Sequence, residues 1–168
     1  MTEGFLKICH SIRLGIVICI LISALRGLTG GAFAQGSATV EEYLAHAADA
    51  TLVPADELEI DGVKSRCGRR PTIMDPGAAS VSAAPEGFIV LNPRHLEKLP
   101  TPVKLWTFAQ ACGHYFRGPD LGPADCFAVQ RGRRQNWLTP EGFAQVCAHA
   151  GDSRCNHMRL CWDDPDMR

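Results

Sequence analysis

The sequence predicts an α+β fold, in which a small antiparallel sheet is followed by a helical half. Residues 58–91 contain short β-prone runs separated by turn residues, whereas residues 101–161 carry apolar residues at helical spacing. Strands that precede helices in this way, without alternating with them, are typical of an α+β domain. Six cysteines spread over residues 67–161 predict that disulfides staple the two halves.

Residues 1–34 have the features of a secretory signal peptide. Lys7 and Arg13 precede an apolar run at residues 14–25, and a small-x-small sequence ends at Ala34. We expect cleavage after Ala34 and export to the periplasm or the extracellular space. The apolar run is shorter than the ~20 residues of a membrane span, so we expect no stable span after cleavage; an uncleaved anchor is the alternative.

Removal of the signal peptide leaves residues 35–168, which is enough chain for one compact domain. The formal charge of the whole chain is −1, and residues 1–34 hold three of the 17 basic residues and one of the 18 acidic residues. The remainder has 14 basic and 17 acidic residues, a net charge of −3. This balance argues against nucleic acid as a partner, because such proteins usually carry a basic domain.

The six cysteines of this domain predict disulfides, because an even number in an exported chain usually forms pairs. They are Cys67, Cys112, Cys126, Cys147, Cys155 and Cys161. Two pairings are symmetric about predicted helix bends, Cys126–Cys147 and Cys112–Cys126, and they exclude one another. We prefer Cys126–Cys147 because its longer loop gives two helices room to align, and the partners of the other cysteines stay open.

The sheet is predicted from three segments. Asp61-Gly62 lies between short β-prone runs in residues 58–64 and is the strongest hairpin signal in the chain. Residues 70–74 and 87–91 are further strand candidates, and the Pro-, Ala- and Ser-rich residues 75–86 between them are predicted to form a loop.

Helices are predicted from apolar spacing and from capping residues. Ser37 is the expected cap of a helix over residues 37–50, and Asn92-Pro93 opens a short helix that ends near Leu99. Thr-Pro opens the central helix at Thr101 and a later one at Thr139, since a capping hydroxyl followed by proline favours a helix start. The other predicted helices cover residues 119–131 and 152–161.

The strongest functional signal is the stretch WTFAQACGHYFRGPDLGPADCFAVQRGRR, which begins at Trp106 and predicts two amphipathic helices joined near Gly118. Two pairs of positions lie four residues apart, one on each helix, and therefore share a helix face: Gln110 with His114, and Leu121 with Asp125. A tight bend between the helices would turn these two polar faces toward each other and build a small site.

This stretch resembles the H-E-x-x-H…E-x-x-x-D pattern of gluzincin-type zinc metallopeptidases over about thirty residues. In that pattern two histidines and a later glutamate bind Zn²⁺, and the glutamate after the first histidine activates water. Here the matching positions hold Gln110, Ala111, His114 and Leu121, and the supporting aspartate is kept as Asp125. One of three metal ligands, His114, therefore remains, and the motif is degenerate.

The residue types at these positions predict a scaffold without peptidase chemistry. A glutamine oxygen is a weak neutral donor to zinc and leucine is none, while alanine removes a general base usually worth ~10²–10⁴-fold in rate. The sequence therefore indicates an exported, catalytically inactive metallopeptidase-like protein, a pseudoenzyme with no cofactor, that binds a peptide or protein partner. The alternative is a metal-dependent peptidase or hydrolase with a rebuilt, non-standard zinc site. The residues that could join His114 in such a site are His149, His157, Asp120 and Asp125.

Other interpretations of the same residues follow from their types. The preferred interpretation of His114 is a buried histidine hydrogen-bonded to Asp125 in a structural role. A cysteine–histidine hydrolase of Cys112 and His114 is disfavoured, because residues two positions apart on a helix point in different directions. Disulfide bonding is the preferred fate of Cys112. In the resembled peptidases a strand ahead of the motif helix borders the cleft, and residues 87–91 take that place in order. An open edge there would accept a peptide as an added strand, whereas the preferred interpretation is an ordinary core strand.

The basic cluster at residues 131–134 has two interpretations. The preferred one is a solvated helix end, where arginines complement the helix dipole and pair with Asp152, Asp163 or Asp164. The other is a site for an anionic ligand.

Overall fold

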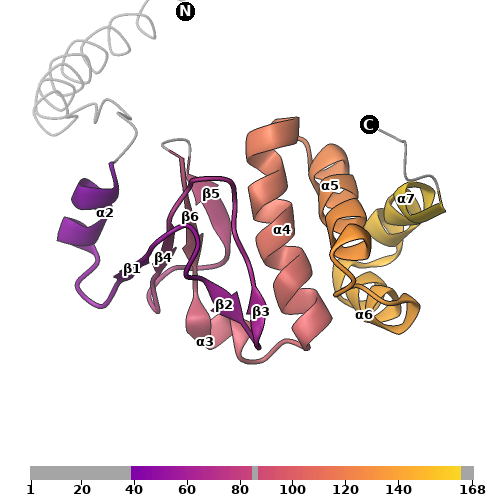
Figure 1. Ribbon diagram of the computed structural model, residues 1–168, viewed down its shortest axis with the longest axis horizontal. Coiled ribbons are helices and arrows are strands. Elements are labelled where there is room, and N and C mark those ends of the chain that lie inside the picture. The colour runs from indigo at the N-terminus through magenta and orange to yellow at the C-terminus, as the bar shows by residue number, and fades with distance from the viewer. Residues whose placement is uncertain (1–38, 85–86, 164–168) are drawn as a thin grey trace, which may run out of the picture. The chain divides into compact units, whose positions relative to one another are not determined.

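The computed structural model describes residues 39–84 and 87–163, so that the predicted signal peptide and its cleavage site lie outside the described residues. The prediction of an α+β fold is confirmed, with strands in the first half and long helices in the second (Figure 1). The strands are β1 (Thr51–Val53), β2 (Glu59–Ile60), β3 (Val63–Lys64), β4 (Thr72–Met74), β5 (Ser82–Ala84) and β6 (Phe88–Leu91).

Four strands form the main sheet in the order β1-β4-β6-β5. The β1–β4 and β5–β6 pairs are antiparallel, whereas β4 and β6 are parallel, so the expected antiparallel sheet is in fact mixed. The connection from β4 passes through the edge strand β5 before it returns to β6, and this return makes β4 and β6 parallel. β6 is therefore a central strand, and the preferred interpretation of residues 87–91 is confirmed.

The predicted hairpin at residues 58–64 is confirmed, but it forms a separate two-stranded sheet of β2 and β3. Its turn residues Asp61 and Gly62 have φ angles of 47° and 82°. Positive φ at both central positions is the geometry for which Asp-Gly is favoured in tight hairpins.

The helices are α2 (Val40–His46), α3 (Pro93–Leu96), α4 (Thr101–Arg117), α5 (Leu121–Arg134), α6 (Pro140–Ala150) and α7 (Asp152–Asp163). Each predicted helix has a counterpart, with shifts at the ends. The first is capped by Thr39, whose hydroxyl accepts a hydrogen bond from the Glu42 amide, and the expected cap Ser37 lies outside the described residues. Thr139 caps α6 as predicted.

The start of the central helix differs from its prediction. Pro100 takes the capping position of α4 and Thr101 lies inside the helix. The hydroxyl of Thr101 instead donates a hydrogen bond to Asp61 Oδ2 at 2.6 Å, beside the ion pair between Lys104 Nζ and Asp61. This contact attaches the β2–β3 turn to the beginning of α4.

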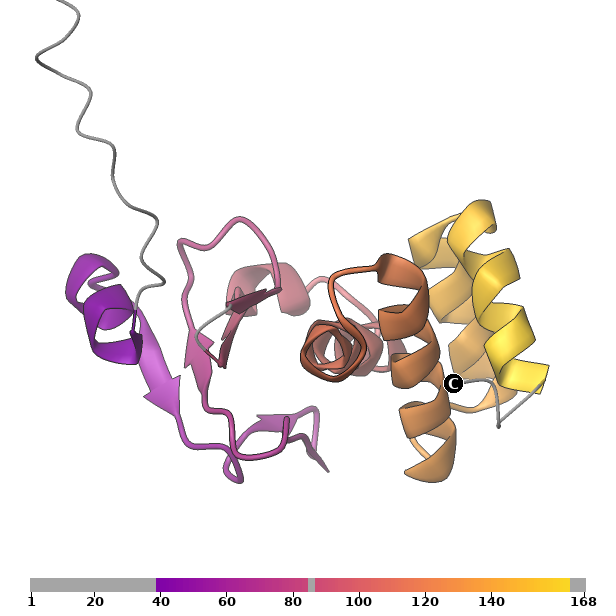
Figure 2. The same ribbon diagram turned by 90° about the horizontal axis from the view of Figure 1, so that it is seen from above.

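The helix α4 lies between the sheet and the other long helices, and Figure 2 shows it almost end-on in that place. One face of α4, with Leu105 and Phe108, packs against buried residues of β2 and β6. Another face, with Val103 and Trp106, packs against α5, α6 and α7. A 17-residue helix that is apolar on two sides is expected to be a central element, since only its ends and narrow stripes reach solvent.

The far face of the sheet is covered by α2. Tyr43 and Leu44 pack against Phe88, and the Tyr43 hydroxyl donates to Asp75 Oδ2 at 2.7 Å. Burial and this carboxylate raise the pKa of Tyr43 to about 12, because both disfavour the phenolate. The hydrogen bond fixes α2 on the sheet.

The six cysteines form three disulfides, which confirms the prediction of disulfide bonding: Cys67–Cys112, Cys126–Cys161 and Cys147–Cys155. The preferred Cys126–Cys147 pairing and the competing Cys112–Cys126 pairing are both wrong. The pairing of Cys126 with Cys147 assumed that α6 folds back along α5, whereas α6 packs on α4 and α7, and α7 packs on α5. The cysteine of α7 is therefore the one that meets Cys126. No helix within residues 39–84 and 87–163 is both long enough and apolar enough to cross a membrane.

Candidate functional site

A pocket of about 640 Å³ lies between the edge strand β5, the second half of α4 and the turn that leads into α5. Its wall from the sheet side consists of Val81, Ser82, Ala83 and Ala84. The helical side contributes Gln110, Ala111, His114, Tyr115, Gly118, Pro119, Leu121 and, from α7, Arg154. We call it the motif pocket, because four of the five degenerate motif positions line it.

The bend between the two motif helices brings four of the expected positions into one pocket, whereas Asp125 does not line it. Gln110, Ala111 and His114 lie on one face of α4, and Leu121 is the first residue of α5 after the bend at Gly118. Gly118 has a φ of 88°, a left-handed conformation that glycine adopts without steric cost. This bend brings Leu121, whose side chain is 52% exposed, to the mouth of the same pocket.

The imidazole of His114 is held at both ring nitrogens. Its Nδ1 lies 3.0 Å from the carbonyl oxygen of Gly118, and its Nε2 lies 2.8 Å from the side-chain amide nitrogen of Gln110. A carbonyl oxygen can only accept and an amide NH₂ can only donate, so the arrangement fits a neutral imidazole with its proton on Nδ1. The Nε2 lone pair, which the resemblance would give to zinc, is occupied by the glutamine.

The donors around the motif pocket do not fit a catalytic zinc. Such a site needs three ligands of the His, Asp, Glu or Cys type and an open position for water. Among the described residues that line the pocket, only His114 is a His, Asp, Glu or Cys. The others contribute an amide, a phenol, a guanidinium, a hydroxyl or apolar groups. Ala111 has no carboxylate to accept a proton from water.

Asp125 has a different partner from the one offered by the sequence analysis. Its carboxylate is 1% exposed and is held by Arg154, with Nε at 2.9 Å from Oδ2 and Nη2 at 2.6 Å from Oδ1. The expected pair of Asp125 with His114 is therefore wrong, because α7 brings a guanidinium to the position where the imidazole was expected. The same guanidinium lies 4.9 Å from the centre of the Trp106 ring, and Arg154 is one of the residues that line the motif pocket.

The edge strand β5 presents main-chain groups beside the motif pocket. The Gly87 amide donates to the Ala84 carbonyl at 3.0 Å, and Ala84 is opposite Phe88, so the polar main-chain groups of Ala84 are directed toward β6. Successive residues of a strand point their N–H and C=O groups to opposite sides. Those of Ala83 are therefore directed to the open side of the sheet. The Tyr115 hydroxyl donates to the carbonyl oxygens of Ala84 and Phe88 and joins this hairpin to α4.

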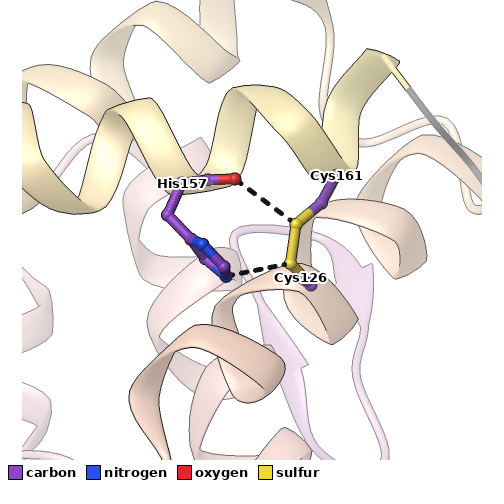
Figure 3. A group of neighbouring side chains, drawn as sticks. All are labelled: Cys126, His157 and Cys161. Carbon is purple, nitrogen blue, oxygen red and sulfur yellow. Dashed lines mark hydrogen bonds between the residues drawn. A yellow bond between two sulfur atoms is a disulfide. The ribbon is translucent and has the colours of Figure 1, made fainter. Parts of the chain in front are cut away.

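Among the described residues, no group of His, Cys, Asp and Glu side chains that could bind a metal includes His114, so the rebuilt metal site has no counterpart there. One such group gathers three donors within 4.8 Å of one another, and it consists of Cys126, His157 and Cys161 rather than of side chains around His114. Figure 3 shows the two sulfur atoms bonded as a disulfide, with the His157 ring turned toward Cys126 at 3.5 Å. Sulfur atoms joined in this way are not the thiolates that bind zinc.

The remaining candidates of that site are placed elsewhere. His149 is exposed on α6 and its ring packs edge-on against Trp106 at 6.3 Å, and Asp120 is exposed ahead of α5. The cysteine–histidine pair is also wrong, because Cys112 is bonded to Cys67.

The basic cluster at residues 131–134 is not paired as expected. Within the described residues the ion pairs are Lys104–Asp61 and Arg154–Asp125, so Asp152 and Asp163 form none, and Asp164 lies outside the described residues. Arg133 packs over the Trp162 ring at 4.9 Å and donates to the Trp162 carbonyl.

Two contributors to the motif pocket were missed by the sequence analysis, Arg154 and the strand β5. Residues 82–84 read Ser-Ala-Ala, which is a weak strand signal on composition alone. The sequence places Arg154 and Asp125 on two predicted helices, and their opposite charges are the one signal that they could pair. No spacing rule predicts contacts between segments so distant in the chain.

Comparison with known proteins gives no relative for this chain: no protein-family model, no curated protein and no solved structure matches it.

Proposed function

We propose that this chain is an exported, catalytically inactive metallopeptidase-like protein that binds an extended peptide segment in the motif pocket, along the edge of β5. The observation that carries the proposal is the meeting of four motif positions with the edge of β5, which has no second strand partner among the described residues, in one pocket. The signal-like sequence of residues 1–34 and the three disulfides support export, since disulfides persist in oxidising compartments.

The strand edge supplies the main-chain part of the recognition. An extended peptide that adds to β5 would bond to the N–H and C=O of Ala83 and would not depend on the identity of its own side chains. β5 has three residues, so main-chain bonds alone give a short ladder and the pocket must supply the rest. This arrangement favours a peptide with one side chain turned toward α4.

The chemistry of the pocket supports an uncharged peptide side chain. Ala111, Pro119 and Leu121 are apolar, and the one guanidinium, from Arg154, is already paired with Asp125. A volume of about 640 Å³ lies within the ~300–1,000 Å³ of typical small-ligand sites and has room for an aromatic or large aliphatic side chain. Gln110 and Ser82 remain as polar groups that can orient the bound segment.

The test starts from a library of extended peptides, from which binders to the purified, disulfide-bonded protein are selected and measured by fluorescence anisotropy. Ala83→Pro removes the outward N–H of β5 and blocks strand addition, while proline is tolerated on edge strands. We expect Ala83→Pro to raise the Kd of the peptide at least about tenfold, because the free energy of one to two hydrogen bonds is lost. Ala83→Thr keeps the N–H and serves as the matched control.

A second pair of variants tests the apolar part of the pocket. Leu121→Glu places a carboxylate at the mouth of the motif pocket and should weaken the same peptides, because a charge there must be desolvated when the peptide binds. Leu160→Glu is the control, since Leu160 is similarly exposed at 56% on α7 but does not line the pocket.

The rival function, a metal-dependent hydrolase, has its own readout. Cleavage of a selected peptide that requires added zinc and is lost in His114→Ala would overturn the proposal of an inactive protein. Equal binding by the parent protein, Ala83→Pro and Leu121→Glu would instead remove this pocket as the peptide site.

A further inference from the structure

A second groove, of about 280 Å³, lies at the end of α5 and shares no residue with the motif pocket. Its polar residues are Arg66, Arg131, Arg134 and Gln135, and its other residues are Gly68, Phe116 and Phe127. We call it the arginine groove. Three guanidinium groups line it, and none of its described lining residues carries a carboxylate.

Arg131 is the central cation of this groove. It is half-buried, and its donors are directed to neutral acceptors: Nη2 donates to the Arg66 carbonyl oxygen, Nε lies 3.2 Å from Gln135 Oε1, and Nη1 lies 3.5 Å from Cys112 Sγ. Burial, and then the nearby guanidinium groups of Arg66 and Arg134, lower the pKa of Arg131. A guanidinium in this position is electrostatically uncompensated within the described residues, because the ion pairs there involve other cations.

An uncompensated, partly buried cation costs free energy, and an anion in the groove would offset that cost. Arg66 and Arg134 approach from two different segments, the loop after β3 and the end of α5, so an anion would meet guanidinium groups from both. Gln135 adds a neutral donor, since its Oε1 accepts from Arg131 and from Trp137 Nε1 at 3.1 Å and its NH₂ stays available.

The remaining wall of the groove is aromatic. Phe116 and Phe127 stack with ring centres 5.4 Å apart and an interplanar angle of 20°, and Phe116 is 50% exposed. Phe127 is partly buried, and the Arg70 guanidinium lies 5.3 Å from the centre of the Phe116 ring. The exposed part of Phe116 therefore supplies the apolar surface beside the guanidinium groups of the groove. Helix-dipole complementarity accounts for arginines in the last turn of α5, but it does not account for Arg66 or for the exposed ring of Phe116.

We propose that the arginine groove binds an oxyanion carried on an aromatic or other flat apolar group, with Arg66, Arg131 and Arg134 holding the anion and Phe116 contacting the apolar part. The guanidinium fork matches the paired oxygens of phosphate, sulfonate and carboxylate groups. The common chemistry is therefore a small aromatic oxyanion.

The test is calorimetric titration of the disulfide-bonded protein at low salt with phenyl phosphate, benzenesulfonate and benzoate, and with phenol and inorganic phosphate as the two partial ligands. We expect at least one aromatic oxyanion to bind about tenfold more tightly than both partial ligands, and to weaken as salt is raised because the contacts are ionic. The preferred anion distinguishes the three oxyanion classes. No binding by any of the three at millimolar concentration would overturn the proposal.

The test variant is the double variant Arg66→Gln/Arg134→Gln, in which two exposed arginines are replaced. Arg131 keeps its hydrogen bond to the main-chain carbonyl of residue 66. We expect it to lose at least about tenfold in affinity. Arg94→Gln is the control, because Arg94 is an exposed arginine on α3 that does not line the groove. If the double variant binds as tightly as the parent, the groove is not the site.

A second measurement uses the parent protein alone and so does not require that any variant folds. Amide shifts followed by NMR during titration of the parent protein should move for the main chain around Arg131 and Gln135. Shifts confined to residues of the motif pocket would overturn the assignment of the anion to the arginine groove.

Discussion

The ring of His114 is oriented as a metal ligand would be, although its neighbours do not supply a metal site. Its Nδ1 is directed to the Gly118 carbonyl oxygen, so Nε2 is turned toward Gln110 and the motif pocket. A hydrogen bond from the distal ring nitrogen to a carbonyl is how metal-binding histidines are commonly oriented. Compared with the zinc-peptidase pattern, the orientation of the ring is present, whereas positions 110 and 121 carry none of the usual zinc ligands.

This geometry predicts the outcome of restoring the motif. The triple variant Gln110→His, Ala111→Glu and Leu121→Glu should gain zinc affinity if the helix pair is inherited from a zinc peptidase, because three ligands and a base would then face one pocket. Zinc bound per molecule, measured after dialysis by elemental analysis, is the readout.

The single variants are the controls for that experiment and should each gain little, because one added ligand leaves the coordination incomplete. Adding His114→Ala to the triple variant should abolish the gain. A folded triple variant that binds no more zinc than the parent would count against descent from such peptidases.

At this scale the sequence predicted that Gln110, His114 and Leu121 meet, but it did not predict the place or the partner of Asp125. Spacing of four residues places Gln110 and His114 on one helix face whatever the rest of the fold does. The partner of Asp125 depends on how α7 packs against α5, and helical periodicity carries no information about the packing of helices distant in sequence. Arg154, which is 29 residues away, was therefore not found.

At the level of elements, the motif pocket depends on how closely α4 and α5 approach each other. A Cβ atom on Gly113 would lie 2.8 Å from the Ala124 carbonyl oxygen and 3.0 Å from its Cα. Both are main-chain atoms, which cannot move aside without shifting α5. Gly113 therefore sets the separation of the two motif helices.

Gly113→Ala should destabilise the protein. The gain in helix propensity is ~1 kcal/mol, whereas overpacking at a main-chain contact costs ~1–3 kcal/mol, so we expect a net loss of up to ~2 kcal/mol in the free energy of unfolding. Urea denaturation followed by far-UV circular dichroism measures it.

The control is Gly122→Ala, where the added Cβ would lie 2.8 Å from the Nε2 of His157. That ring is exposed and can turn away, so no main-chain contact opposes the gain in helix propensity, and Gly122→Ala should be no less stable than the parent. Equal losses in the two variants would show that main-chain contact at Gly113 is not what limits the helix separation.

Elements were predictable where local sequence determines them. The Asp61-Gly62 hairpin and the Thr139 cap depend on turn and cap chemistry, and both are present. β5 was predicted as loop because Ser-Ala-Ala has little strand preference of its own; it is a strand because it pairs with β6, the most buried strand of the sheet.

At the level of the whole molecule, the disulfides close chain loops of very different length. Cys67–Cys112 joins the segment after β3 to α4 across 45 residues, whereas Cys147–Cys155 joins α6 to α7 across 8 residues. The first links the sheet half to the helical half, and the second fastens a local turn at Gly151.

Removing these bonds should therefore have unequal effects. Chain-entropy estimates give about 4 kcal/mol for the longer loop and about 2.5 kcal/mol for the shorter one. We expect Cys67→Ser/Cys112→Ser to lower the thermal midpoint more than Cys147→Ser/Cys155→Ser, as differential scanning calorimetry would measure. A larger loss from the shorter loop would show that local packing of α6 and α7 outweighs loop entropy.

The placement of Arg154 on α7 also has a consequence for the order of assembly. A chain that has been synthesised only as far as α5 already contains the strand edge and the motif helices, but one wall of the cavity and the partner of a buried carboxylate do not yet exist. The lining of the motif pocket is therefore completed late in synthesis, only when α7 has emerged and docked.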